Sequence, residues 1–226
     1  MNRTAWLIFF LIITAADIFA IAIGNSDLRW GTKIFIVPLL MGWLISSLPL
    51  IKPAIHKWVI AALIFSWGGD VLLMLEPQNS IFFILGLVSF LVAHICYIVF
   101  FQRIKKEEKV KTNWLLILPV PVYYTLLIIF LFPHLGNLKL PVLIYGAVIS
   151  TMLAFALHMQ QIMYKAAGTK MMMGAILFII SDSVLAINKF YQSFGGAGIV
   201  IMLTYAFAQL LIVSGVITYI RQTSAD

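Results

Sequence analysis

The sequence predicts an all-α polytopic membrane protein: a bundle of eight transmembrane helices with its N and C termini in the cytoplasm. Its 226 residues are 63% hydrophobic and only 10% charged, whereas soluble domains are about half apolar and about a quarter charged. The apolar residues form long uninterrupted runs, and a spanning helix needs about 20 of them. A membrane β-barrel would instead show alternating segments of about 10 residues, so the runs exclude a barrel.

Turn-forming and helix-breaking residues separate the runs. Such breaks occur at 24–27, 76–79 and 195–196. The predicted spans are 4–24, 31–51, 57–76, 79–102, 112–133, 138–162, 169–190 and 197–220. Pro119 and Pro121 fall inside the fifth span, where a kink is tolerated if neighbouring groups satisfy the freed carbonyls.

The distribution of Lys and Arg predicts the orientation, because cytoplasmic loops carry an excess of these residues. With the N terminus inside, 11 of the 15 basic residues, Lys52 among them, fall on the cytoplasmic side. The four outer ones are Arg29, Lys33, Lys139 and Lys189. The net charge of +7 does not indicate nucleic-acid binding, since the basic residues lie between apolar runs. The basic run 103–111 is interpreted as a solvated anchor near anionic headgroups.

The N-terminal apolar run bears on signal-peptide cleavage, and the single cysteine bears on disulfide formation. The run resembles a signal peptide with a cleavage site near residues 20–22, but Asp17 interrupts its apolar core, so a retained first helix is favoured. Asp17 is either a third buried acid or a structural partner of Lys33. Cys96 lies inside a span, so no disulfide framework is expected. We expect one domain over 1–226, with a weak candidate 4+4 repeat of 1–110 and 111–226.

Besides Asp17, two carboxylates lie several residues inside predicted spans: Asp70 in FSWGGDVLLML and Asp182 in GAILFIISDSVLAINKF. A charge in the hydrocarbon region costs at least about 2.5 kcal/mol on insertion scales, so it faces a cavity or a partner. Asp70 lies about six residues before the outer end of its span and Asp182 about eight, which places them within roughly 3 Å of one depth. We therefore expect the two carboxylates to meet in one chamber in the outer half of the bilayer.

Other polar residues share helix faces with these acids or with each other, because residues three, four or seven apart lie on one face. The pairs are Ser66 and Asp70, Asp182 and Lys189, His94 and Tyr97, and Tyr205 and Gln209. Taken singly, the serine (like Ser181), tyrosine and glutamine groups can be explained by bonds between helices, and His94 by a satisfied interior histidine. Four helices that direct polar groups inward favour a polar pocket instead.

Two membrane-buried carboxylates can act as a general acid and a general base. Burial favours the protonated form of a carboxyl group, and a second carboxylate nearby favours it further in one of the pair. Glycosidases use such pairs to cleave acetals through oxocarbenium-like states, and a vinyl ether is a suitable lipid counterpart. Carboxylates alone do not single out this substrate, because a proton-coupled transporter or a lipid-binding protein would use the same buried acids.

A metal site has weak support from the sequence. The spacings HxxxH, HExxH and CxxC do not occur, and zinc sites commonly use such spacings. We therefore expect no metal and no other cofactor. A metal-dependent, amidase-like lipid hydrolase built on His94 and the acids is a third reading, and it predicts that chelators abolish activity.

Several of these residues, in this order, resemble the lysoplasmalogenase family of integral membrane proteins (YhhN-type). The most specific block is GAxxFxxSD…NKF, which runs here from Gly174 through Ser181-Asp182 to Asn188-Lys189-Phe190. The segments 69–70 and 93–97, the pair Tyr205 and Gln209, and Lys33 with the later Pro38 also resemble the family. The chain departs from it after Lys33, where members often read Lys-Pro-Leu and this sequence reads Lys-Ile-Phe.

The resemblance implies a membrane hydrolase that cleaves the vinyl ether bond of lysoplasmalogens and releases a fatty aldehyde and a glycerophospho-ethanolamine or -choline. It implies that Asp70 and Asp182 are the catalytic pair, one donating a proton and the other activating water. The expected substrate-binding or orienting residues are Lys33, Ser66, His94, Tyr97, Ser181, Asn188, Lys189, Tyr205 and Gln209. Among these, Lys33 and Lys189 would attract the phosphate. The expected partners are a lyso-lipid and the bilayer, which is the inner or plasma membrane if the source is bacterial.

Overall fold

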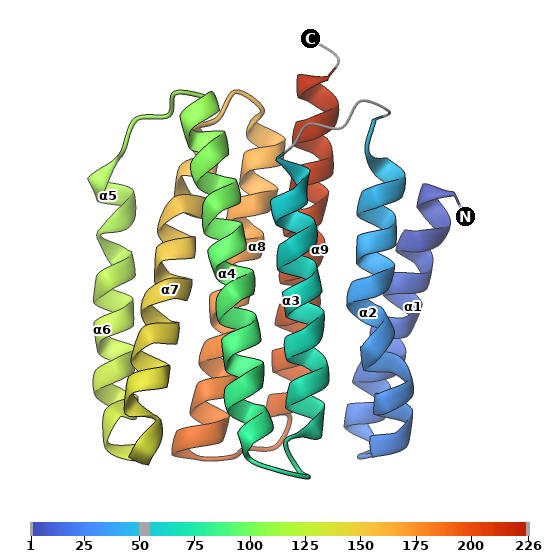
Figure 1. Ribbon diagram of the computed structural model, residues 1–226, viewed down its shortest axis with the longest axis vertical. Helices are drawn as coiled ribbons and strands as arrows, with labels where there is room; N and C mark the ends of the chain where they lie inside the picture. Colours follow the sequence, from blue (N-terminus) through green and yellow to red (C-terminus); the bar gives the residue numbers. More distant parts are fainter. Residues whose placement is uncertain (1, 50–54, 225–226) are drawn as a thin grey trace.

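The protein is an all-helical, multi-pass membrane protein. Its computed structural model describes residues 2–49 and 55–224, and these residues form helices and connecting turns without a strand. Eight helical segments are long and apolar enough to cross a membrane. The prediction of eight spans is therefore confirmed. The start of the first helix and the end of the last helix lie at the same end of the bundle (Figure 1), and the cytoplasmic location of the two termini stays a prediction.

The first four spans are α1 (Arg3–Ala22), α2 (Ser26–Ser47), α3 (His56–Leu75) and α4 (Ile81–Glu107). The fifth is α5 (Trp114–Ile117) followed by α6 (Pro119–Leu131). The last three are α7 (Lys139–Leu157), α8 (Lys165–Ala186) and α9 (Ala197–Thr223). Short 3₁₀ turns occupy Phe132–His134, Gly136–Leu138 and His158–Gln161, and a π-helical turn, Ile187–Tyr191, extends α8.

Helix ends depart most from the sequence prediction at α2 and α4. Helix α2 begins five residues earlier than predicted because Asn25 caps it: its side-chain oxygen accepts a hydrogen bond from the Leu28 backbone N–H at 2.9 Å. The predicted end of that span at residue 51 and the predicted anchor Lys52 lie outside the described residues. Helix α4 continues to Glu107, where its last turn leaves the apolar run and carries Lys105 and Lys106.

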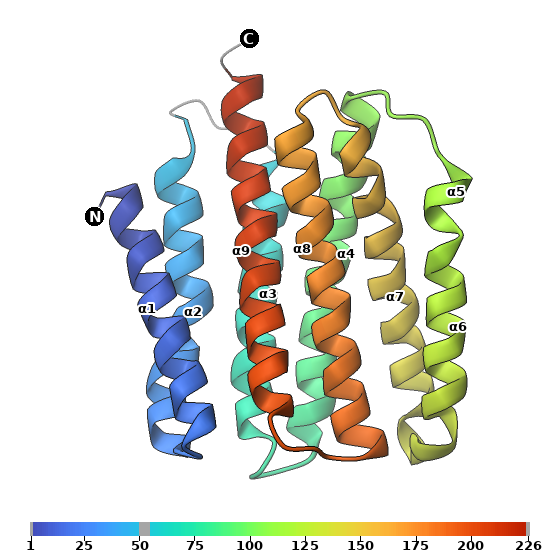
Figure 2. The ribbon, with the colours of Figure 1, turned by 180° about the vertical axis from the view of Figure 1, so that it is seen from behind.

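Helices that follow one another in the chain pack as pairs: α1 with α2, α3 with α4, and α8 with α9. Both views place α3, α4, α8 and α9 in the middle, with α1 and α2 at one side and α6 at the other (Figures 1 and 2). Glycine allows the closest approach. A Cβ on Gly174 would lie 2.7 Å from the Ala208 carbonyl oxygen, so α8 and α9 touch backbone to backbone there.

Candidate active site

A cavity near the end of the bundle away from the termini is lined by both predicted acids. It has a volume of about 250 Å³ and lies between α2, α3, α8 and α9. Its polar lining consists of Arg29, Lys33, Asp70, Glu76, Ser181, Asp182, Asn188, Lys189 and Tyr205. The expected convergence of Asp70 and Asp182 on one chamber is therefore present in the structure. We call this space the acid cavity.

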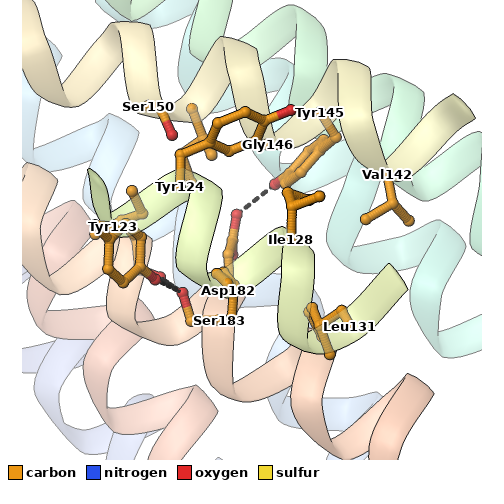
Figure 3. Close-up of a pocket in the computed structure, with 14 residues that line it drawn as sticks. Tyr123, Tyr124, Ile128, Leu131, Val142, Tyr145, Gly146, Ser150, Asp182 and Ser183 are labelled. Atoms are coloured by element: carbon orange, nitrogen blue, oxygen red, sulfur yellow. Dashed lines mark hydrogen bonds between the residues drawn. The ribbon is translucent and has the colours of Figure 1, made fainter. Parts of the chain in front are cut away.

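On the α8 side, Asp182 is held by a tyrosine and a histidine. The Tyr145 hydroxyl on α7 donates a hydrogen bond to Asp182 Oδ2 (Figure 3). His94 Nε2 on α4 lies 3.4 Å from the same oxygen and 2.9 Å from the Tyr145 hydroxyl. Because Tyr145 gives its single proton to Asp182, its contact with His94 requires a proton on Nε2. Tyr145 thus fixes one oxygen of Asp182 by a hydrogen bond, and His94 in turn holds the Tyr145 hydroxyl.

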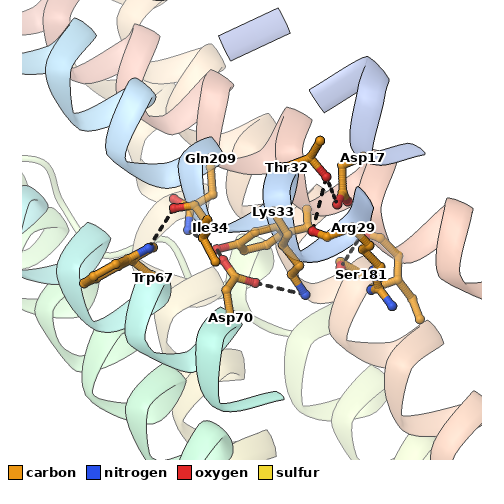
Figure 4. Close-up of polar contacts among 11 residues, drawn as sticks. Asp17, Arg29, Thr32, Lys33, Ile34, Trp67, Asp70, Ser181 and Gln209 are labelled. Carbon is orange, nitrogen blue, oxygen red and sulfur yellow. Dashed lines mark hydrogen bonds and ion pairs between the residues drawn. The ribbon is translucent and has the colours of Figure 1, made fainter. Parts of the chain in front are cut away.

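On the α3 side, Asp70 has a cationic partner. Lys33 Nζ, from α2, lies 3.4 Å from Asp70 Oδ1 (Figure 4), and the Tyr205 hydroxyl donates to Oδ2 at 2.6 Å. Asp70 is only 4% exposed. An opposite charge and a donated hydrogen bond both favour the ionised form of a carboxyl group, so the two acids have electrostatically different surroundings.

Two of the predicted residues, Tyr97 and Gln209, form a hydrogen-bonded chain that ends at the Tyr205 hydroxyl. The Tyr97 hydroxyl donates to Gln209 Oε1 at 2.6 Å, and Gln209 Nε2 donates to the Tyr205 oxygen at 3.5 Å. Since that oxygen accepts from Gln209, the Tyr205 proton points toward Asp70. Tyr97 and Gln209 are therefore orienting groups, and neither lines the acid cavity.

The remaining predicted residues have mainly structural contacts. Ser181 donates to the Ile201 carbonyl oxygen on α9 at 3.0 Å, and the Asn188 side chain accepts from the Phe194 backbone N–H at 3.2 Å. Both still line the cavity. Ser66 is fully buried outside the lining, and its Oγ has no hydrogen-bond partner among residues 2–49 and 55–224. Lys189 pairs with Glu76 at the cavity mouth.

The pairing of Asp17 with Lys33 that the sequence left open does not form. Asp17 accepts a hydrogen bond from Thr32 Oγ1 at 2.9 Å, whereas Lys33 turns to Asp70. Consecutive residues of a helix point about 100° apart. Thr32 therefore faces α1 while Lys33 faces α3 (Figure 4).

Sequence reasoning missed Tyr145 and Arg29. Tyr145 is one aromatic residue in an apolar run, and no spacing marks it. Arg29 was counted only as a topology charge, although it lies four residues before Lys33 and shares its helix face. It lines the acid cavity, and its Nε is buried without a hydrogen-bond partner in the described part of the chain. Among the described residues, no group of three or more His, Cys, Asp and Glu side chains could hold a metal ion.

Comparison with known proteins gives a consistent set of matches. The model of the YhhN family matches residues 28–216. The lysoplasmalogenase of Mycobacterium tuberculosis is 30% identical over 163 residues, 71% of this chain and 60% of that protein. Lysoplasmalogenase TMEM86B of Rattus norvegicus is 34% identical over 160 residues, 70% of this chain and 60% of the relative.

Lysoplasmalogenase TMEM86B of Homo sapiens is 30% identical over 213 residues, which make up 89% of this chain and 82% of the human protein. By contrast, the matches span about 60% of the length of the mycobacterial and rat relatives. No solved structure matches the chain.

Proposed function

This chain belongs to the YhhN family, and we propose that it is a membrane hydrolase that cleaves the vinyl ether bond of lysoplasmalogens. The names of its relatives support the substrate class. The observation that carries the chemistry is that Asp70 and Asp182, from helices far apart in the sequence, line one cavity. The products would be a fatty aldehyde and a glycerophospho-alcohol.

We assign Asp70 as the general base. The Lys33 ammonium and the Tyr205 hydroxyl each contact one of its oxygens and stabilise the carboxylate, the form that can accept a proton from water. This pairing supports base chemistry over a purely structural role, because a paired carboxylate at a cavity wall still has lone pairs free for water.

We assign Asp182 as the general acid. Among the described residues, the basic side chain within ion-pair distance of Asp182 is that of His94 alone, and apolar side chains such as Phe90 and Leu185 line one of the spaces around it. With Oδ2 occupied by Tyr145, Oδ1 would carry the proton into the cavity. A carboxyl group that is protonated beside such apolar walls is a competent general acid.

With these roles the reaction balances, and water is the only reactant besides the lipid. Asp182 gives its proton to the β-carbon of the vinyl ether, whose π electrons form the new C–H bond and leave an oxocarbenium ion. Asp70 takes a proton from water as the water oxygen bonds the α-carbon, giving a hemiacetal. Asp70 then returns that proton to the ether oxygen as the C–O bond breaks, and Asp182 takes the hydroxyl proton. Aldehyde and alcohol leave, and both carboxyl groups are restored.

The phosphate would lie at the cavity mouth. Lys33 and Lys189, the expected phosphate residues, are each paired with a carboxylate. Arg29 lines the same cavity and forms no ion pair within the described residues, so its guanidinium is the cation best placed to take a phosphate. A planar guanidinium binds phosphate through two parallel hydrogen bonds.

Aldehyde release from the reconstituted protein tests this function. Lyso-lipids with a vinyl ether, an ester or an amide link would be compared, with intact folding checked by thermal unfolding. We expect aldehyde from the vinyl ether only, and a loss of about 100-fold or more in Asp70→Asn and in Asp182→Asn. Substrate flux without product would support a transporter instead, and activity abolished by chelators would support the metal-dependent reading.

A further inference from the structure

Asp182 lies where three cavities meet. Besides the acid cavity, it lines an apolar pocket between α4, α7 and α8 that includes Leu87 and Phe190. It also lines a groove between α6, α7 and α8 (Figure 3). We call these two spaces the inner pocket and the side groove. A reacting group at Asp182 therefore has access to all three.

Neighbouring spaces share parts of their walls. The acid cavity and the inner pocket share Leu73, Phe83, Phe90 and Leu185 in addition to Asp182. The inner pocket and the side groove share Val142, Tyr145, Asp182 and Ala186. The cavity with the charged groups, the inner pocket and the groove along α6 thus adjoin one another at Asp182.

Polarity changes sharply between these spaces. The acid cavity carries lysine, arginine and glutamate side chains, whereas the side groove is walled largely by aliphatic groups such as Leu127, Ile128 and Ile149. Its polar groups are mostly engaged: Tyr124 donates to the Leu143 carbonyl oxygen at 3.0 Å, and Tyr123 bonds Ser183. The groove therefore suits a hydrocarbon chain.

The side groove lies at the edge of the bundle. Helix α6 stands at the edge of the bundle beside α7 (Figure 2), and it packs against α7 and the turn Ile187–Tyr191. The Tyr123 and Ser183 hydroxyl groups form a hydrogen bond between α6 and α8. The outer face of α6 carries Leu126 and Ile129, which are 64% and 66% exposed and would contact lipid tails. A chain could pass between α6 and α8 without leaving the bilayer.

We propose that the side groove binds the single hydrocarbon chain of the substrate and that this chain enters sideways from the membrane between α6 and α8. The inference rests on the proposed function, since it places the vinyl ether at Asp182 and the polar head in the acid cavity.

Ile128→Trp and Ile129→Trp form a matched pair of variants, because the two residues are adjacent and only Ile128 lines the groove. The probe is a saturated alkyl lysophospholipid, which has no vinyl ether and is bound without being cleaved. We expect Ile128→Trp to weaken binding of the long-chain probe about tenfold relative to a short-chain one, as when roughly two methylenes lose contact. Ile129→Trp should bind both probes like the wild type.

Labelling of the wild type keeps the test decisive if Ile128→Trp fails to fold. A probe with a photoreactive group at the chain end should label peptides from α6 or α7. Labels confined to α1 and α2, or equal binding by the two tryptophan variants, would overturn the side groove. Because neither readout needs turnover, chain-dependent binding without aldehyde release would retain the groove and reject the proposed reaction. Aldehyde release with no effect of Ile128→Trp on binding would retain the proposed reaction and reject the groove.

Discussion

Lys33 on α2 and Asp70 on α3 are joined across the wall of the acid cavity, with Nζ 3.4 Å from Oδ1. Both side chains are almost fully buried. A buried pair of this kind adds little net stability, but removing one partner leaves an uncompensated charge. The contact therefore makes α2 part of the proposed reaction centre, because Lys33 supplies a charge that favours the ionised form of Asp70 against the effect of burial.

Replacing Lys33 separates support of Asp70 from binding of phosphate. We expect Lys33→Met to lower kcat about 100-fold with little change in KM, because the base loses the cation that holds it ionised. Lys33→Arg should retain most of the activity. Aldehyde release measured over a range of substrate concentrations gives both constants. A higher KM at unchanged kcat in Lys33→Met would assign this lysine to the phosphate instead.

Arg29→Gln tests the phosphate site at the cavity mouth. We expect KM for a lysoplasmalogen to rise by about 10- to 100-fold, the range for losing a hydrogen bond to a charged group, while kcat stays near the wild-type value. An alkenyl glycerol without phosphate should be processed equally by both proteins.

Lys139→Gln is the matched control for Arg29, because Lys139 belongs to the same predicted outer set and lies outside the cavity lining. It contacts the ring of Phe132, so its removal should leave KM unchanged. Equal effects of the two substitutions would indicate a general charge effect at the membrane surface and would remove Arg29 from the site.

Tyr145→Phe probes the donor that fixes Asp182. The substitution deletes the hydrogen bond to Oδ2 and leaves the ring in place. We expect kcat to fall about 10- to 100-fold, because a hydrogen bond to a charged or charging group contributes about 1.5–3 kcal/mol. Single-turnover aldehyde release would locate the loss in the chemical step.

Tyr124→Phe is the control, since this tyrosine also lines the side groove but donates to a backbone carbonyl. Its kcat should stay within about twofold of the wild-type value, because Tyr124 would contact only the hydrocarbon chain and not the reacting atoms. If both phenylalanine variants lost activity together, the effect would come from the shape of the groove and the hydroxyl of Tyr145 would have no separate role.

The sequence predicts what depends on composition and depth, and it misses what depends on which helices are neighbours. The eight spans follow from the length of the apolar runs, and counting residues to the helix end was enough to bring Asp70 and Asp182 to one level. The partner of Lys33 could not be predicted, because helical periodicity does not say whether α1 or α3 lies opposite a given face. The contact of Tyr145 could not be predicted for a related reason: it depends on the distance from its hydroxyl to Asp182 on another helix.

The contact between α8 and α9 positions Asp182 and Tyr205, so we expect Gly174→Ala to disturb both. The new Cβ would lie 2.7 Å from the Ala208 carbonyl oxygen and 2.8 Å from the Ile212 backbone nitrogen, and neither backbone atom can move without moving the helix. Overpacking of this kind costs about 1–3 kcal/mol. Thermal unfolding in detergent should show that loss, and aldehyde release should fall with it.

Gly31→Ala is the opposite case and serves as the reference. A Cβ there meets nothing within 4 Å, and Gly31 lies inside α2, so alanine should stabilise the helix by about 0.5–1 kcal/mol. The two substitutions add the same methyl group to a helix interior and differ only in what it meets. A similar shift in unfolding temperature for both would mean that α8 and α9 are not in backbone contact at Gly174.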